Sequence, residues 1–371
     1  MVVSIIGGGA SAHLLAVLLS GKGHRVRIMT SRPDAWERDL ELEAGGEVLR
    51  GRIEGATSTP FDALEGADVA ILCMPVHQYP VALANILPAI VRNPKCIVGV
   101  VYGQGGFNWM VHDVCHRNSF PVFRHFAVGL LPWITRVKQY GRSVISYGPK
   151  YRNGIACSDD ATFDYLQQNL LDDFSWNYWG SGRFERIPNF FTLTMTVDNQ
   201  IIHPSRCFAL SQQCSVWTRK EEVPYFYRDF DDASAEILRG IDADYSVLRR
   251  GYFERFPQLN NRYNLNYLEL EHWSYGAHDP DIKASFINSK TLREIKPPIV
   301  QSRDGLWRLD VNHRFFKDDF AFGLEIAQWF GRQLGCDLPH IDRLVNWFRA
   351  EIEPCQELRQ TIRPVMEFCE G

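Results

Sequence analysis

"VVSIIGGGASAHLLAVLLSG", residues 2–21, decides the first part of the fold. Residues 2–6 form an apolar run of mainly β-branched side chains, which is typical of a buried strand. Three glycines follow at once, and from Ala10 onward the apolar residues take helical spacing. This switch of period across a glycine turn predicts a strand, a tight turn and a helix.

The same alternation continues through the first half of the chain. Residues 24–30 ("HRVRIMT"), 67–75 ("ADVAILCMP") and 96–103 ("CIVGVVYG") are further apolar runs, separated by helical or turn-rich connections. Strands that alternate with helices indicate a doubly wound, mainly parallel sheet. We therefore expect an α/β fold, with a Rossmann-type dinucleotide-binding domain over residues 1–187.

The second half of the chain loses this β-rich alternation beyond about residue 188. Apolar residues repeat with helical spacing over residues 318–335 and 340–352. A chain of 371 residues is long enough for two domains. The sequence therefore predicts a mainly α-helical second domain over residues 188–371.

The composition argues against several classes of protein. The 40 basic and 44 acidic residues give a formal net charge of −4 without a basic run, so nucleic acid is not an expected partner. No stretch approaches about 18 uncharged apolar residues, and the N-terminus lacks the features of a signal peptide. The nine cysteines contain no C-x-x-C pair and are expected to be reduced thiols, not metal ligands. We expect a cytoplasmic protein without a membrane partner, either a monomer or a homodimer.

The glycine turn matches a dinucleotide-binding motif. Gly7, Gly9 and Ala12 form the pattern G-x-G-x-x-A between the predicted strand and helix. Gly7 permits the tight turn, Gly9 lets the backbone approach a pyrophosphate, and Ala12 keeps the helix close to the strand. The first helical turn, at Ala10 and Ser11, then faces the anion.

The residues after the second strand indicate which nucleotide is preferred. A ribose-binding acid is expected here in an enzyme that uses NAD, but this chain has Thr30, Ser31 and Arg32. A guanidinium with two hydroxyls suits a 2′-phosphate, so we favour NADPH. NAD remains possible, because Arg32 is alternatively a solvated loop charge and Asp34 is within reach of the ribose.

Residues 195–206 ("MTVDNQIIHPSR") place a histidine next to a proline in an apolar run. Pro204 removes a backbone donor and tends to bend a helix. His203 is then either a packed core residue or an imidazole that the bend directs into a cleft between the domains. The second interpretation suits acid–base chemistry, because an imidazole titrates near neutral pH.

Three stretches of the chain resemble the octopine and opine dehydrogenases of the 6-phosphogluconate-dehydrogenase superfamily. They are residues 129–150 ("GLLPWITRVKQYGRSVISYGPK"), 201–206 ("IIHPSR") and 312–324 ("NHRFFKDDFAFGL"), in the same order and at similar separations. The resemblance covers nearly the whole chain. It implies an NAD(P)-dependent oxidoreductase acting on CH–NH bonds, which condenses an amino acid with a 2-oxo acid such as pyruvate and reduces the imine to an opine.

The resemblance also implies functions for single residues of the second domain. His203 matches the family's catalytic histidine, and Asp319 matches an acid five residues after an arginine that fixes the imidazole tautomer. Asp318 is the fallback, and both acids are alternatively stabilisers of a helix N-terminus. Arg314 is expected to bind the cofactor pyrophosphate, which would couple cofactor binding to closure. A substrate carboxylate and a surface salt bridge are its alternatives.

Positions at the ends of predicted strands complete the expected site. Gln104 follows the strand over 96–103, where ligands bind in doubly wound sheets, and the resemblance suggests that it contacts the 2-oxo acid carboxylate. The two glycines after it alternatively only form a turn. Pro75 and Val76 are expected to line the cofactor, and His77 is a less favoured second base.

The identity of the amino acid is left open. In "NLNYLELEHWSYG", residues 264–276, Asn266 takes a position that holds tryptophan in relatives that use arginine. Trp273, Tyr275 and Glu271 either rebuild that wall or are ordinary packing residues, so arginine is not predicted. Two other functions compete with the opine reaction: reduction of a simple 2-oxo or 3-hydroxy acid, and non-catalytic sensing of NADP.

Overall fold

The computed structural model describes residues 1–174, 183–289 and 292–355. The chain forms two compact units, one over Met1–Thr194 and one from Met195 onward. The predicted boundary was residue 187, and the division between the units falls inside the short helix α6 (Phe190–Met195). Each unit is described by itself.

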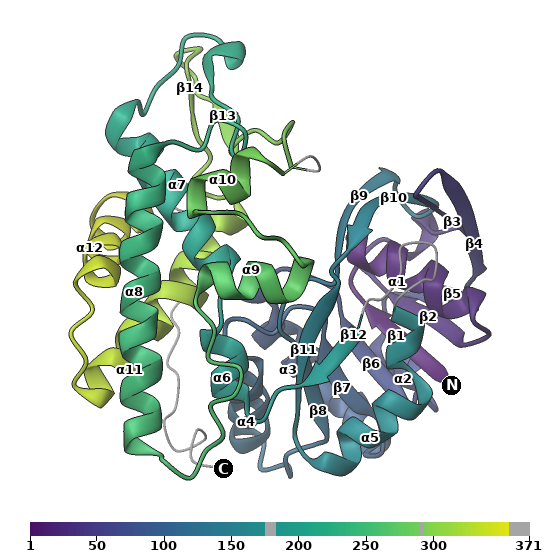
Figure 1. Cartoon of the computed structure of the whole chain (residues 1–371). Helices are drawn as coiled ribbons and strands as arrows, with labels where there is room; N and C mark the ends of the chain where they lie inside the picture. The colour runs from purple at the N-terminus through teal and green to yellow at the C-terminus, as the bar shows by residue number, and fades with distance from the viewer. Residues whose placement is uncertain (175–182, 290–291, 356–371) are drawn as a thin grey trace. The chain divides into compact units, whose positions relative to one another are not determined.

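The first unit is built on an eight-stranded sheet in the order β12-β11-β8-β7-β6-β1-β2-β5 (Figure 1). Neighbouring strands are parallel except for β8 and β11. The central strands are buried along almost their whole length, which explains their continuous apolar runs. The predicted α/β fold with a doubly wound sheet is therefore confirmed. The strands are β1 (Val2–Ile6), β2 (Arg25–Met29), β5 (Gly55–Thr57), β6 (Val69–Leu72), β7 (Ile97–Val100), β8 (His125–Val128), β11 (Arg152–Cys157) and β12 (Arg183–Arg186).

Most connections of this sheet are helices and short turns, whereas those from β2 to β5 and from β8 to β11 contain the strands of a second sheet. Their order along the chain gives the strand–helix alternation that the sequence predicted. The helices are α1 (Ala10–Gly21), α2 (Pro60–Leu64), α3 (Tyr79–Arg92), α4 (Phe107–Arg117) and α5 (Asp160–Asn169), with 3₁₀ turns η1 (Pro33–Ala35), η2 (Val76–Gln78) and η3 (Leu171–Phe174).

A second sheet of four strands, which the sequence analysis did not predict, packs on the first unit's helix α1. Its order is β4-β3-β10-β9, and only the pair β3 and β10 is parallel. Residues of β3 and the first half of β10 alternate between buried and more exposed positions, and β4 and most of β9 are not buried, so the pattern of apolar runs did not reveal these strands. The strands are β3 (Asp39–Ala44), β4 (Glu47–Arg52), β9 (Trp133–Gln139) and β10 (Ser143–Pro149).

The second sheet explains the composition of α1. This helix contacts β1 and β2 of the large sheet and all four strands of the small one (Figure 1). Its residues from Ala12 to Leu19 are all buried, as expected for a helix that is apolar on every side. Gly51 of β4 allows the close approach, since a side chain there would overlap Val17 and Ser20. The helix after the glycine turn is thus held between two sheets.

The second unit is mainly helical, as predicted, with one small hairpin (Figure 1). The long helix α8 contacts α7, α11 and α12. The helices are α7 (Asn199–Gln213), α8 (Asp232–Arg255), α9 (Tyr267–Tyr275), α10 (Ile282–Ile287), α11 (Glu325–Leu334) and α12 (Pro339–Trp347), with 3₁₀ turns η5 (Lys220–Glu222) and η8 (Glu353–Cys355) and strands β13 (Ile299–Gln301) and β14 (Trp307–Leu309). In the described ranges, none of the helices combines the length and the apolar character needed to span a membrane.

The helices predicted over 318–335 and 340–352 each contain a π-helical part. The π-helix η6 covers Phe315–Leu324 before α11, and the π-helix η7 covers Phe348–Ile352 after α12. Apolar spacing does not separate a π-helix from an α-helix over so short a range, so the sequence predicted a single helix in each place. Such π-helical segments are rare and are frequent at functional sites.

Candidate active site

The glycine turn has the geometry that its motif predicts. Gly7 has a φ of 130°, and a side chain there would overlap the carbonyl of Cys73 at the end of β6. Gly9 is the extended N-cap residue of α1, and no side chain caps the amides that follow it. A side chain at Gly9 would meet the described protein only at the Cys73 carbonyl oxygen, 3.9 Å away. The uncapped amides of Ala10, Ser11 and Ala12 therefore begin the helix beside open space, which fits the pyrophosphate of a dinucleotide.

The end of β2 brings together polar groups and the aromatic ring of Tyr140. Thr30 is buried and its Oγ1 accepts a hydrogen bond from the Arg32 backbone amide at 3.4 Å. Ser31 and Arg32 are exposed, and the Arg32 guanidinium carbon lies 3.7 Å from the centroid of the Tyr140 ring. Asp34, the alternative ribose ligand, is exposed in η1. The sequence analysis missed Tyr140, although the residue lies in the quoted stretch 129–150.

The residues that follow β6 and β7 differ in their accessibility. Pro75 and His77 are half-buried and Val76 is buried, at the start of η2. Gln104 is fully buried, and its Oε1 accepts a hydrogen bond of 2.6 Å from the Tyr102 hydroxyl. The two glycines after Gln104 both have positive φ and lead into α4, as the turn interpretation expected. The contact between Gln104 and a substrate stays a prediction.

His203 and Asp319 form a buried pair in the second unit. The imidazole Nδ1 lies 2.7 Å from Asp319 Oδ2, across 116 residues of sequence, and both side chains are only 2% exposed. The imidazole stacks on Phe315 with 3.5 Å between ring centroids, and Nε2 lies 3.4 Å from the Tyr227 hydroxyl. The pair thus has the carboxylate–imidazole geometry that the sequence analysis expected of these two residues.

Two helices place this pair. His203 and Pro204 lie inside α7, which continues as an α-helix past the proline to Gln213. Asp319 lies in the π-helix η6, in which Asp318 is buried as well. Pro204 therefore does not end the helix, and both a bend there and the direction of His203 toward a second domain stay predictions.

Burial dominates the electrostatics of the pair. It lowers the pKa of His203 well below its ordinary value, and the positive charge of Arg314 acts in the same direction. It raises the pKa of Asp319 well above its ordinary value, and the carboxylate of Asp318 adds to that rise. Both shifts disfavour separated charges inside the unit, so the imidazole rests in its neutral form.

The hydrogen bond leaves Nε2 as the proton-exchanging atom. In the protonated pair, the proton between the two groups rests on the carboxyl oxygen and Nε2 carries a proton of its own. In the deprotonated pair, Nδ1 donates to the Asp319 carboxylate and Nε2 carries a lone pair that can accept a proton, with the Tyr227 hydroxyl 3.4 Å away. The pair can therefore act as an acid and as a base at the same atom, which is the requirement for general acid–base chemistry.

Arg314 supplies a positive charge that acts on this pair. It directly precedes η6, is half-buried, and its guanidinium carbon lies 5.3 Å from the Phe315 ring centroid. Its charge adds to the fall in the pKa of His203 and opposes the rise in the pKa of Asp319. Together with burial, the same charge helps to hold the pKa of His313 at about 4. A cation therefore lies within electrostatic range of the buried pair.

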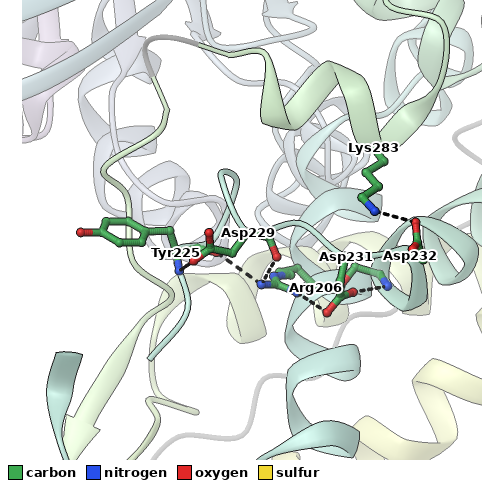
Figure 2. A network of polar contacts seen from close by, with 7 residues as sticks. Arg206, Tyr225, Asp229, Asp231, Asp232 and Lys283 are labelled. Carbon is green, nitrogen blue, oxygen red and sulfur yellow. Dashed lines mark hydrogen bonds and ion pairs between the residues drawn. The ribbon is translucent and has the colours of Figure 1, made fainter. Parts of the chain in front are cut away.

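Arg206, three residues after His203, holds the loop that carries Tyr227. It is fully buried, and its Nη1 donates to Asp231 Oδ2 at 2.9 Å (Figure 2). Its Nη2 donates to the carbonyl oxygens of Asp229, at 2.7 Å, and Tyr225, at 3.3 Å (Figure 2). Since Asp231 also caps α8, the guanidinium ties α7 to the start of α8 through this loop. The sequence analysis missed this network.

The residues considered for the amino acid site lie on or near α9. Asn266 is the N-cap of that helix, and its side chain accepts a hydrogen bond of 3.0 Å from the Glu269 amide. Trp273 packs its ring edge against Tyr263, and Tyr275 is 37% exposed. Asn266 therefore has a capping function that needs no ligand.

The comparisons with known proteins agree with this two-part arrangement. Residues 186–351 match the family model described as NAD/NADP octopine/nopaline dehydrogenase, alpha-helical domain, and residues 2–102 match that of NADP oxidoreductase, coenzyme F420-dependent. Tauropine dehydrogenase of Arabella iricolor is 24% identical over 94% of this chain and 90% of its own length. Residues 186–351 belong to the helical-domain family of the octopine and nopaline dehydrogenases. The resemblance noted in the sequence is thereby confirmed.

Solved opine dehydrogenases share the fold of this chain. The structure of octopine dehydrogenase with NADH and L-arginine has a TM-score of 0.79 and 20% identity, over 95% of this chain and 90% of that one. Yersinopine dehydrogenase with NADP⁺ bound has a TM-score of 0.64 and 16% identity, over 94% of this chain and 90% of that one. These relatives are NAD(P)-dependent oxidoreductases that act on CH–NH bonds.

The expected site residues of this chain divide between the two units. The first unit contains the glycine turn, the group at the end of β2, and the residues after β6 and β7. The second unit contains His203, Arg314 and Asp319, and it brings the imidazole and the carboxylate into hydrogen-bond distance.

Proposed function

We propose that this protein is an opine dehydrogenase that condenses the amino group of an amino acid with a pyruvate-like 2-oxo acid and reduces the imine with NADPH or NADH. The observation that carries the proposal is the buried His203–Asp319 pair in the helical unit. The match of residues 186–351 to the helical-domain family of the octopine and nopaline dehydrogenases supports it.

The proposed chemistry requires proton transfers at one carbon. The amine adds to the oxo carbon to give a carbinolamine, and loss of water gives the imine. A bound reduced nicotinamide supplies the hydride that converts the imine to a secondary amine. In the forward direction, Nε2 of His203 donates a proton to the departing hydroxyl, which leaves the imine protonated on nitrogen and ready for the hydride. In reverse, Nε2 accepts a proton from the water that adds to this protonated imine. Asp319 keeps Nδ1 engaged, so that Nε2 presents the exchangeable proton.

Two groups are proposed for the substrate carboxylates. Arg314 lies within electrostatic range of His203, which supports binding of a carboxylate beside the reacting carbon more than binding of a pyrophosphate. Gln104 remains the proposed amide ligand of the 2-oxo acid. Its position just beyond the carboxyl end of β7 supports this, since ligands of doubly wound sheets bind there.

The proposed cofactor is NADPH, with NADH as the alternative. Gly7, Gly9 and the first turn of α1 would hold the pyrophosphate, and Thr30, Ser31 and Arg32 would hold the 2′-phosphate. An exposed guanidinium at the end of β2 that forms no ion pair with an acid among the described residues supports this preference, because such a cation favours the nucleotide with the extra phosphate.

A substrate matrix tests the function. The purified protein is given each of a set of amino acids with pyruvate, 2-oxoglutarate or glyoxylate, and oxidation of NADPH and of NADH is followed by absorbance. The opine reaction requires both an amino acid and an oxo acid. Oxidation with an oxo acid alone would instead indicate a reductase of simple 2-oxo acids, and nucleotide binding without any turnover would indicate a sensor.

The catalytic histidine has its own test. His203→Ala is expected to lower turnover by at least about a hundredfold, the usual scale for loss of general acid–base help. Nucleotide affinity should change less than about twofold, since the expected nucleotide-binding residues other than Arg314 belong to the first unit. Unchanged turnover in a folded variant would remove His203 from the mechanism.

A further inference from the structure

Tyr140 occupies the nucleotide end of the first unit, on the turn between β9 and β10. Its hydroxyl lies 3.2 Å from Thr30 Oγ1 and accepts a hydrogen bond of 3.4 Å from Trp36 Nε1. The face of its ring lies 3.7 Å from the guanidinium carbon of Arg32. A residue on the hairpin of the small sheet therefore contacts two of the three residues expected at the 2′-phosphate, Thr30 and Arg32.

The position of this turn is fixed by contacts with α1 and η1. The amide of Gly141 donates to Nε2 of His13 at 2.7 Å, and the opposite ring nitrogen of His13 donates to the Gly9 carbonyl at 2.8 Å. The His13 ring also stacks on Trp36, with 4.1 Å between ring centroids. Gly141 has a φ of 74°, and a side chain there would overlap the carbonyl of Ala35. The turn that carries Tyr140 is thus linked through one imidazole to the glycine turn itself.

The Arg32 guanidinium is held by the ring and not by a carboxylate. Among residues 1–174, 183–289 and 292–355, no ion pair joins Arg32 to an acid, and the residue is exposed. An arginine stacked on an aromatic face keeps its N–H donors in the plane of the guanidinium, directed outward. In that geometry the donors match a phosphate in two hydrogen bonds.

The Tyr140 hydroxyl also lies over the glycine turn. A side chain at Gly8 would overlap this hydroxyl and approach Thr30 Oγ1 to 3.0 Å. Gly8 therefore makes room for the phenol beside the first turn of α1, where a bound dinucleotide passes from its pyrophosphate to its adenine ribose.

We propose that Tyr140 is a specificity-determining residue of the nucleotide site. Its ring is the platform that holds the Arg32 guanidinium toward a 2′-phosphate, and its hydroxyl stands with Thr30 beside the ribose. The proposal rests on the NADPH preference in the proposed function. Tyr140 acts through Arg32, and is a positioning residue for discrimination between the two nucleotides.

Binding of two half-cofactors to the purified full-length protein tests the proposal. 2′,5′-ADP and 5′-AMP differ only in the 2′-phosphate, and calorimetry gives the ratio of their dissociation constants. Arg32→Ala should reduce the preference for 2′,5′-ADP by about tenfold or more. Tyr140→Ala should reduce it by about three- to tenfold, the scale of a lost cation–π contact. Tyr140→Phe keeps the platform and should retain the preference within about twofold.

A double variant separates positioning from simple packing. If Tyr140 acts through Arg32, Tyr140→Ala should not change the ratio any further in the Arg32→Ala background. Tyr147→Ala is the matched control, because Tyr147 is an exposed tyrosine of the same hairpin and should leave the ratio unchanged. Tyr140→Leu keeps apolar bulk without a π face, and serves if Tyr140→Ala does not fold.

Three results would overturn the proposal: equal weakening of both probes by the Tyr140 variants, no change in the ratio, or the same loss with and without Arg32. The probes carry no nicotinamide and need no substrate. Failure of the amino acid to stimulate turnover would therefore reject the opine reaction and leave this binding result unaffected. An unchanged ratio with amino-acid-dependent turnover would reject only the assignment of Tyr140.

Discussion

Replacement of Asp319 by asparagine is the sharpest test of the buried pair. Asp319→Asn keeps the size of the side chain and removes the charge opposite Nδ1 of His203, 2.7 Å away. The amide can also donate to Nδ1, which leaves the proton on Nε2 and favours one tautomer permanently. We expect kcat/KM to fall while nucleotide binding is retained.

The magnitude follows from the kind of hydrogen bond that is lost. A hydrogen bond to a charged group contributes about 1.5–3 kcal/mol, and the 2% exposure of both partners keeps water from replacing it. Each 1.36 kcal/mol of transition-state stabilisation is tenfold in rate. The expected loss in kcat/KM is therefore about 10- to 150-fold.

Initial rates of NADPH or NADH oxidation with both substrates measure this loss, and fluorescence titration of the nucleotide is the parallel readout. Asp318→Asn is the matched control. Asp318 is also buried in η6, but it influences the pair through its charge on Asp319, so its variant should lose less activity. A loss below about threefold in folded Asp319→Asn would refute the reasoning, and a larger loss in Asp318→Asn would transfer the function to that carboxylate.

Three further predictions concern the cation, the glycine turn and the response to pH. Arg314→Ala should raise the KM of the oxo acid by about 10- to 100-fold, as expected for a lost charge-assisted hydrogen bond, whereas weaker nucleotide binding with an unchanged oxo acid KM would assign it to the pyrophosphate. Gly7→Ala should lower the free energy of unfolding by about 1–3 kcal/mol more than Gly46→Ala, because both glycines have positive φ but only Gly7 has a carbonyl against the new methyl group. Burial lowers the pKa of His125 to about 4, below the ordinary value of 6.5, so the unfolded chain binds its proton first as the pH falls. The free energy of unfolding should therefore decrease from about pH 6.5 toward pH 4, by up to about 3 kcal/mol from this residue, and urea unfolding of His125→Gln should show a correspondingly flatter pH dependence.

Some features of the protein were determined by short stretches of its sequence. The apolar run, the glycines and the helical spacing of residues 2–21 predicted β1, the turn and α1. Each of these signals depends only on residues that are close together in the sequence. Helical spacing likewise predicted the character of the second unit. His203 beside Pro204 marked a candidate residue, since that pairing is visible without any knowledge of packing.

Other features were decided only by the tertiary structure. The partner of the imidazole is 116 residues away, and the π-helix that carries it was not visible in the apolar spacing. Tyr140 reaches Thr30 across 110 residues because a half-exposed sheet, with weak apolar runs, packs on α1. Pairings at such separations depend on which elements dock together, and local propensity carries no information about docking. The sequence therefore determined the main strands and helices of the two units and several reactive groups. Packing determined which of those groups meet.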